Sequence, residues 1–141
     1  MSDNPFAAYN ITTPRQYSES LKKYCQTSGG KNAASYAPFK RQVDFWYAAF
    51  LLAIHRDLEP EKSTDGVNMT QAHILESYRV SHIQLAHLGT HEDIELLAQH
   101  KVVFDWACGT ANAGIPHLLQ ILSDTTDTPL NNLLDELEGL V

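Results

Sequence analysis

The chain has 141 residues, a formal net charge of −7 and 43% hydrophobic residues, which fits a single folded domain. Charged residues make up an ordinary 19% of the sequence, and this content argues against wholesale disorder. The net negative charge disfavours a general nucleic-acid coat protein.

The predicted elements begin with an N-terminal extension, residues 1–37, whose composition is the least typical of a buried core. A short helix is expected from Arg15 to about Gln26. Thr13 would cap this helix and Pro14 would occupy its first turn.

A helical domain is predicted for residues 38–141. In residues 39–58 apolar side chains recur every three or four positions and cover nearly the whole surface, which predicts a central helix. Residues 59–68, with Pro60 and an Asp-Gly pair, are expected to form a polar loop. Leucine and alanine number 31 against 13 valines and isoleucines, a ratio that favours helices.

Two helices are predicted after this loop. The first runs from about Thr70 to Leu88, and Gly89 would end it. Thr90 would then cap the next helix, whose first turn is acidic.

The C-terminal third predicts further helices. The small residues 109–114 would let another helix approach closely. Because Pro116 suits a first turn better than a helix interior, a break is expected near Gly114. Thr128 and Pro129 then predict the start of a last helix with a leucine stripe.

No segment predicts a strand convincingly. The expected fold is therefore all-α: a single compact bundle of five to six helices with a less ordered N-terminal segment. The leucine stripe of the last helix would either pack on the bundle or support self-association, and both interpretations stay open.

Localisation is predicted from three features. The N-terminus lacks a basic stretch followed by an apolar one, so no secretory signal is expected. The longest apolar block, residues 45–54, has about half the length that crosses a bilayer, so no membrane association is expected. Cys25 and Cys108 lack the spacing of a disulfide framework, which predicts a cytoplasmic protein.

The seven histidines were considered as metal ligands. His87 and His91 are four residues apart, but the expected helix end at Gly89 would place them on different helices. His82 and His87 are five apart and do not share a helix face. We therefore predict surface histidines, with no metal and no other cofactor.

An enzyme is the least favoured functional class. No nucleophile–base motif is present, and a site would require the convergence of residues far apart in the sequence. The candidates for such a site are Asp44, His82, Asp105 and Cys108. We predict that no catalytic residues are present.

Charge is distributed unevenly along the chain. Residues 1–56 hold seven basic and three acidic residues, a net charge of +4, whereas residues 57–141 hold three and fourteen, a net charge of −11. The two parts could attract each other in the fold, or the basic part could form a contact surface. The candidate contact residues for an acidic partner or a DNA backbone are Lys22, Lys23, Lys40 and Arg41.

The order of features in residues 39–137 resembles a known family. The matching parts are Phe39-Lys40, Asp44-Phe45, Ala48-Ala49, Leu85-Ala86-His87-Leu88, Asp93-Ile94-Glu95-Leu96-Leu97, Ala111-Asn112-Ala113-Gly114 and the closing leucine helix. They are similar to a small accessory family encoded beside bacterial DNA phosphorothioation (Dnd) genes. The resemblance implies a cytoplasmic accessory protein in a DNA-modification or phage-defence system, which acts by binding partner subunits.

These observations favour a non-enzymatic helical adaptor that binds the protein subunits of a larger complex. The exposed side of residues 130–137 is the expected surface for a partner helix. The alternative is a DNA-backbone binder that uses the basic N-terminal half. It would bind without sequence preference and weaken steeply with salt.

Overall fold

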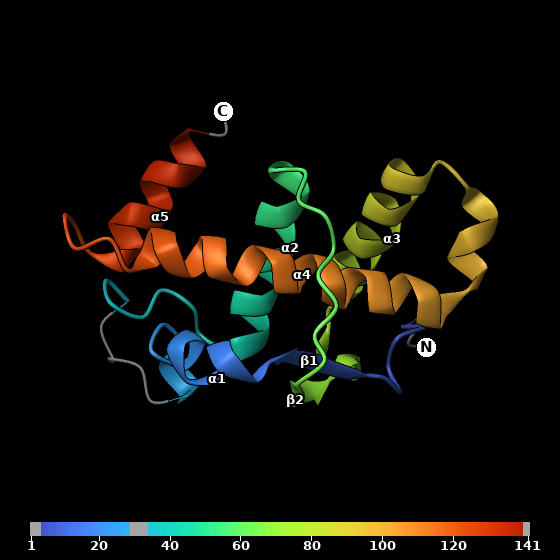
Figure 1. Ribbon diagram of the computed structural model, residues 1–141, viewed down its shortest axis with the longest axis horizontal. Helices are drawn as coiled ribbons and strands as arrows, with labels where there is room; N and C mark the ends of the chain where they lie inside the picture. The colour runs from blue at the N-terminus through green and yellow to red at the C-terminus, as the bar shows by residue number, and fades with distance from the viewer. Residues whose placement is uncertain (1–3, 29–33, 140–141) are drawn as a thin grey trace.

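A computed structural model describes residues 4–28 and 34–139 of the chain. The long helix α4 is the axis of the fold, and the other elements pack along it (Figure 1). The elements in chain order are β1 (Asn10–Pro14), α1 (Arg15–Lys22), α2 (Gln42–His55), β2 (Gly66–Gln71), α3 (Ser77–His91), α4 (His100–Leu122) and α5 (Pro129–Glu138). Short 3₁₀ helices lie at Gln26–Ser28, Ala72–Ile74 and Ile94–Ala98.

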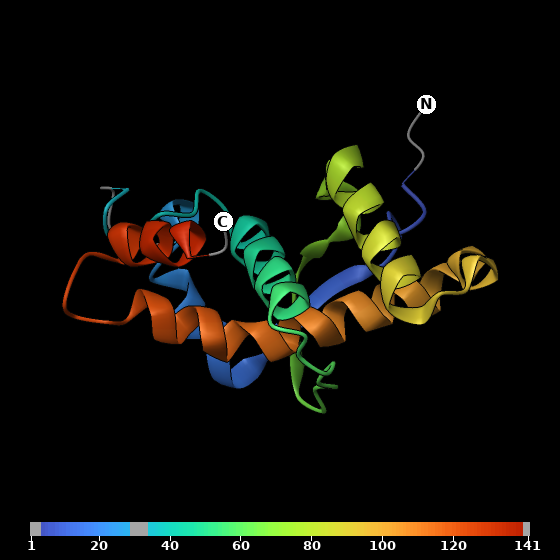
Figure 2. The same cartoon turned by 90° about the horizontal axis from the view of Figure 1, so that it is seen from above.

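Three helices share one side of α4. Helix α3 lies near the N-terminal end of α4, α2 crosses its middle, and α5 lies near its C-terminal end (Figure 2). The segment that joins α2 to β2 lies on the opposite side of α4, and α1 begins there (Figure 2).

The all-α prediction is wrong, because β1 and β2 form a two-stranded antiparallel sheet. Thr12 pairs with Asn68, and the register shifts between Ile11 and Thr12. The strands are short and lie more than 50 residues apart in the sequence, so no hairpin signal marks them. Thr70, the predicted start of a helix, lies in β2, and α3 begins only at Ser77.

Part of the predicted N-terminal extension packs into the core, and residues 1–3 and 29–33 of it lie outside the described residues. Phe6, Ile11 and Leu21 are completely buried, so the predicted extension shares its core with the helical domain. Helix α1 ends four residues before the predicted Gln26. Its N-cap is Pro14, not Thr13, and no side chain caps it.

Helix α4 runs without interruption through the predicted break, and Pro116 lies inside it. The contact with α2 explains why Gly114 is there. A Cβ built on Gly114 would lie 2.0 Å from the carbonyl oxygen of Ala49, so the backbones of α2 and α4 touch at this point. The prediction that the small residues allow a close helix approach is confirmed.

The other side of α4 is held by residues 59–65, here named the crossing segment, which passes in front of α4 in Figure 1. The amide N–H of Glu61 donates to the carbonyl of Gly109 at 2.8 Å. The side-chain amide of Asn112 donates to the carbonyl of Glu61 at 3.1 Å. The middle of α4 is therefore fixed between α2 and the crossing segment.

Two apolar clusters meet along α2 and α4. One cluster joins α2 and α4 to β1 and α3 and contains Trp46, Phe50 and Phe104. The other joins them to α1 and contains Phe45 and Leu118. In the described residues, no helix has both the length and the apolar character needed to cross a membrane.

Candidate functional site

Two of the four predicted basic contact residues, Lys23 and Lys40, lie on neighbouring stretches of the chain. Main-chain hydrogen bonds join Tyr24 to Phe39 and Thr27 to Lys40, so the chain after Lys23 runs beside Lys40. The Thr27 hydroxyl also donates to the Lys40 carbonyl at 2.9 Å.

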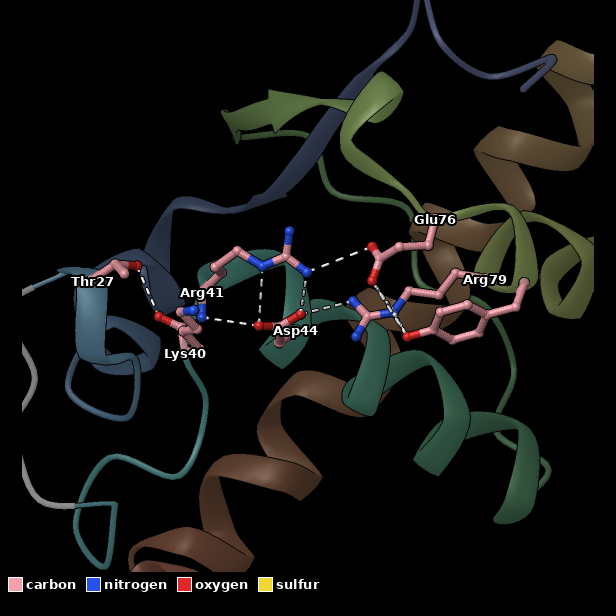
Figure 3. A network of polar contacts seen from close by, with 7 residues as sticks. Thr27, Lys40, Arg41, Asp44, Glu76 and Arg79 are labelled. Atoms are coloured by element: carbon pink, nitrogen blue, oxygen red, sulfur yellow. Dashed lines mark hydrogen bonds and ion pairs between the residues drawn. The ribbon is translucent and has the colours of Figure 1, made fainter. Parts of the chain in front are cut away.

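The other two basic residues are engaged in ion pairs. Lys22 pairs with Glu19 one turn earlier at 3.4 Å. Arg41 pairs with Asp44 at 2.9 Å and with Glu76 at 3.5 Å (Figure 3). Of the four predicted contact residues, Lys23 and Lys40 are the two without an ion pair in the part of the chain that the structure describes.

Arg41 belongs to a network of four charges that joins the N-terminal ends of α2 and α3, named here the α2–α3 ion network (Arg41, Asp44, Glu76 and Arg79). Figure 3 shows the Asp44 carboxylate between the two guanidinium groups. Arg79 donates to it at 2.9 Å, and the Arg79 side chain is only 12% exposed. Burial of the Asp44 carboxyl opposes its ionisation, but the hydrogen bonds from Arg41 and Arg79 outweigh burial and keep its pKa below the usual range.

Aromatic side chains extend this network along the space between α2 and α3. The Arg79 guanidinium lies 4.5 Å from the centroid of the Tyr47 ring, a cation–π geometry. The Tyr47 hydroxyl contacts His82 Nδ1, and the two rings are stacked. Every charged side chain of the α2–α3 ion network has an ion-pair partner within the network, so the network joins α2 to α3.

The four residues considered for an enzyme do not converge on one site. Asp44 and His82 belong to the α2–α3 region, whereas Asp105 and Cys108 lie on one face of α4. Burial raises the pKa of the Cys108 thiol to about 12, so Cys108 is protonated at neutral pH and is a poor nucleophile.

His87 is buried, which differs from the prediction of surface histidines, whereas His91 is exposed. Helix α3 continues through Gly89 to His91, so both residues lie on one helix face and their rings stack 4.0 Å apart. His87 is 1% exposed, its Nδ1 has no hydrogen-bond partner, and the Trp106 ring meets it edge-on. Among the described residues no group of three potential ligands could hold a metal ion.

The buried His87 predicts a pH-dependent stability. Burial, and then the neighbouring His91, lower the pKa of His87 below 6.5. The unfolded chain therefore takes up more protons than the folded chain as the pH falls below about 6.5, and the free energy of unfolding decreases. We expect His87→Gln to flatten this dependence in urea titrations between pH 7.5 and 5.5. The exposed His73→Gln should retain it, and equal slopes for the two variants would contradict the assignment.

Helix α5 begins as the sequence predicts. Pro129 is in its first turn, and the Thr128 hydroxyl accepts from the Asn131 amide at 3.3 Å. Leu133 packs partly on the core. Leu134 and Leu137 are 46% and 49% exposed, and no residue of the helix is fully buried.

Comparison of the chain with protein-family models, with curated proteins and with solved structures found no significant match. The resemblance to the Dnd-associated accessory family therefore stays a prediction.

Proposed function

We propose that the protein is a non-enzymatic adaptor whose helix α5 binds a basic amphipathic helix of a partner protein. The carrying observation is the apolar face of α5, where Leu134 and Leu137 are each about half exposed. On binding, covering the exposed half of a leucine contributes on the order of 1 kcal/mol. Two adjacent leucines on one helix face are the kind of anchor that a helix-in-groove contact uses.

The charge around this face specifies the partner. Residues 123–139 contain five acidic residues and no basic residue. Only Glu136 among them has an ion pair in the described structure, with Arg56 at 2.7 Å. A partner helix with lysine or arginine beside its apolar stripe would complement the acidic flanks.

The position of α5 is fixed well enough to present the face. Arg56, the C-cap of α2, pairs with Glu136 in the last turn of α5, and the amide of Leu130 donates to the carbonyl of Ser35 at 3.0 Å. A preformed face binds at a lower entropic cost than one that must first order itself.

The cellular setting is part of the same proposal. We place the adaptor in the cytoplasm as an accessory subunit of a bacterial DNA-modification or phage-defence complex, on the basis of the resemblance in residues 39–137. DNA-backbone binding is the weaker alternative, because Arg41 and Lys22 are already engaged in ion pairs.

The test is purification of the tagged protein with its native gene neighbours, followed by cross-linking of any protein that co-purifies. We expect the double variant Leu134→Ser/Leu137→Ser to lose at least about tenfold in affinity for the partner. The control Leu85→Ser removes a leucine of α3 that is 63% exposed and should bind like the unaltered protein. The cross-links should map to a basic amphipathic helix.

Three outcomes would overturn the proposal. The first is a partner whose binding is unaffected by the α5 variant. The second is a dimer in light scattering that the α5 variant abolishes, which would assign the face to a second copy of the chain. The third is recovery of nucleic acid alone, lost as salt rises, which would favour the DNA-backbone alternative.

A further inference from the structure

The segment that joins α3 to α4 lies at one end of the molecule and has few contacts with the core. It comprises residues 92–99, here named the α3–α4 connection (Figure 1). None of these eight residues is fully buried, and Ile94 is 70% exposed. Among the described residues, the hydrogen bonds of the connection reach no further than the adjoining turns of α3 and α4. Opening of this end would therefore expose little apolar surface.

The chain changes direction at Glu92, where the backbone is strained. Glu92 is the C-cap of α3 and has a left-handed conformation, with a φ of 54°. This conformation is costly for a residue that carries a Cβ. The Glu92 amide donates to the Leu88 carbonyl at 2.8 Å, so the strain belongs to the closed arrangement of the two helices. A strained residue at the end of a helix is a natural hinge.

His87 lies just before this hinge and is stable only as a neutral side chain. It is 1% exposed, and its Nδ1 is buried without a hydrogen-bond partner. Its ring centroid lies 5.1 Å from that of Trp106 on α4. A proton on His87 would thus place an unpaired positive charge at the contact between α3 and α4.

His91 adds a second titratable ring to the same stack. Its Nδ1 lies 3.0 Å from the His87 carbonyl oxygen. Because a carbonyl can only accept, this Nδ1 carries the hydrogen, and Nε2 is the atom that takes up a further proton. His91 is exposed, so that proton comes from solvent and puts a positive charge on the ring stacked 4.0 Å from His87.

The charged groups of the neighbouring elements do not neutralise this pair. On α4, His100 is exposed and Lys101 pairs with Asp105 at 2.6 Å. From α2 the contact with Trp106 is made by the apolar Phe50. The acidic residues of the α3–α4 connection are exposed and form no ion pair with either imidazole in the described structure; they are Glu92, Asp93 and Glu95.

We propose that the stacked His87–His91 pair is an acid-sensitive switch, whose protonation opens the last turn of α3 and the α3–α4 connection away from α4 while the rest of the fold stays closed. Leu97 and Trp106, which pack against the apolar cluster around Phe50, become accessible in the open form. The switch lies at the opposite end of α4 from α5, so it does not depend on the adaptor function (Figure 2).

The direction and the size of the effect follow from proton linkage. Burial, and then the neighbouring His91, lower the pKa of His87 in the closed form. In the open form the imidazole is solvated, and a solvated histidine has a pKa of about 6.5. The open form therefore binds more protons, and a fall from pH 7.5 to 5.5 should raise its population several-fold, up to about tenfold.

Native-state hydrogen exchange at low urea concentrations, read by NMR, tests the switch. The amides of residues 88–92 should lose protection several-fold between pH 7.5 and 5.5. Their exchange should depend only weakly on urea, because a local opening exposes little surface. The amide of the buried Phe50 should instead show the full urea dependence of global unfolding. This difference separates local opening from the loss of global stability that the burial of His87 also predicts.

Two variants and a control identify the sensor. His87→Gln should abolish the pH dependence of these amides. His91→Gln changes an exposed residue and should leave a smaller pH dependence, so it tests the pair even if His87→Gln does not fold. His73→Gln, on the short helix after β2, should respond to pH like the unaltered protein.

Acrylamide quenching of tryptophan fluorescence gives a second measurement. Trp46 is completely buried, so a change in quenching under native conditions reports Trp106. Quenching should increase between pH 7.5 and 5.5 in the unaltered protein and in His73→Gln, and stay constant in His87→Gln.

The proposal is overturned if the amides of residues 88–92 exchange with the urea dependence of Phe50, because the end of α3 would then open only when the whole protein unfolds. A pH dependence that is the same in His91→Gln as in the unaltered protein would also overturn it, because the stacked pair would then not be the sensor.

Discussion

Replacement of Gly114 by alanine is expected to lower the free energy of unfolding by more than about 3 kcal/mol, or to prevent folding. The added Cβ would lie 2.0 Å from the Ala49 carbonyl oxygen and 2.8 Å from its carbon. Both are main-chain atoms of α2, so no rotamer change can relieve the clash. The two central helices would have to separate, and this would expose the apolar clusters on both sides of their crossing.

Gly89→Ala is the matched control for this experiment. Gly89 also lies within a helix, but nothing lies within 4 Å of a Cβ added there. Alanine at an open helical position stabilises by about 0.5–1 kcal/mol relative to glycine. Urea titrations followed by circular dichroism should therefore show opposite signs for the two variants. Similar small changes in both would contradict the backbone contact between α2 and α4.

The same region shows how far the sequence predicts the fold. The run of small residues before Ile115 correctly predicts a close helix approach, because small side chains are what such a contact needs. Pro116 nevertheless predicts a helix break, because proline has no N–H group and a helix that contains it loses one main-chain hydrogen bond. Packing from α2 and from the crossing segment outweighs that loss, and neither is visible from residues near Pro116 in the sequence.

The sheet is missed for a related reason. β1 has five residues, and only Ile11, Thr13 and Pro14 in it are buried, which is too short an alternation to indicate a strand. Its partner lies beyond α1 and α2, so the pairing depends on how those helices place the two segments. The predicted polar loop is correct for the crossing segment and wrong from Gly66 onward.

The sequence could not show which lysine and arginine side chains form ion pairs in the fold. The spacing of Arg41 and Asp44 allows an ion pair one turn apart, but Glu76 and Arg79 lie more than 30 residues away. The sequence predicts that Gly89 ends one helix and Thr90 caps the next, whereas α3 continues through both residues to its left-handed C-cap Glu92, so the surface prediction for His87 is wrong. The role of Asn112 carries no sequence signal, since its hydrogen bond to Glu61 arises only from the fold.

Replacement of Arg79 by methionine is expected to lower the free energy of unfolding by about 3 kcal/mol. Arg79 is nearly buried, pairs with Asp44 at 2.9 Å and covers the Tyr47 ring. Loss of one partner of a desolvated ion pair costs about 3–5 kcal/mol when the other charge is left unpaired. Because Arg41 still contacts Asp44 at 2.9 Å, we expect the lower part of that range.

A double-mutant cycle separates the ion pair from the packing of the long side chain. Asp44→Asn and Arg79→Met should each destabilise, and the double variant should be at least about 1 kcal/mol more stable than the sum of the two predicts. Arg15→Met is the control, because the Arg15–Asp65 pair is more than 60% exposed on both sides and should contribute less than about 1 kcal/mol. Additive effects of Asp44→Asn and Arg79→Met would contradict the coupling.

Lowering the pH should remove the difference in stability between the unaltered protein and Asp44→Asn. The pKa of Asp44 is lowered in the folded protein, so its ionised form stabilises the fold at pH values above the unfolded pKa of about 3.9. That contribution disappears as the pH falls through the lower, folded value, because Asp44 then becomes protonated in both states. The stability gap between the unaltered protein and Asp44→Asn should therefore be constant above pH 5 and shrink below pH 4. A gap that does not shrink as the pH falls from 4 to 2 would mean that the Asp44 carboxylate does not carry the stabilisation.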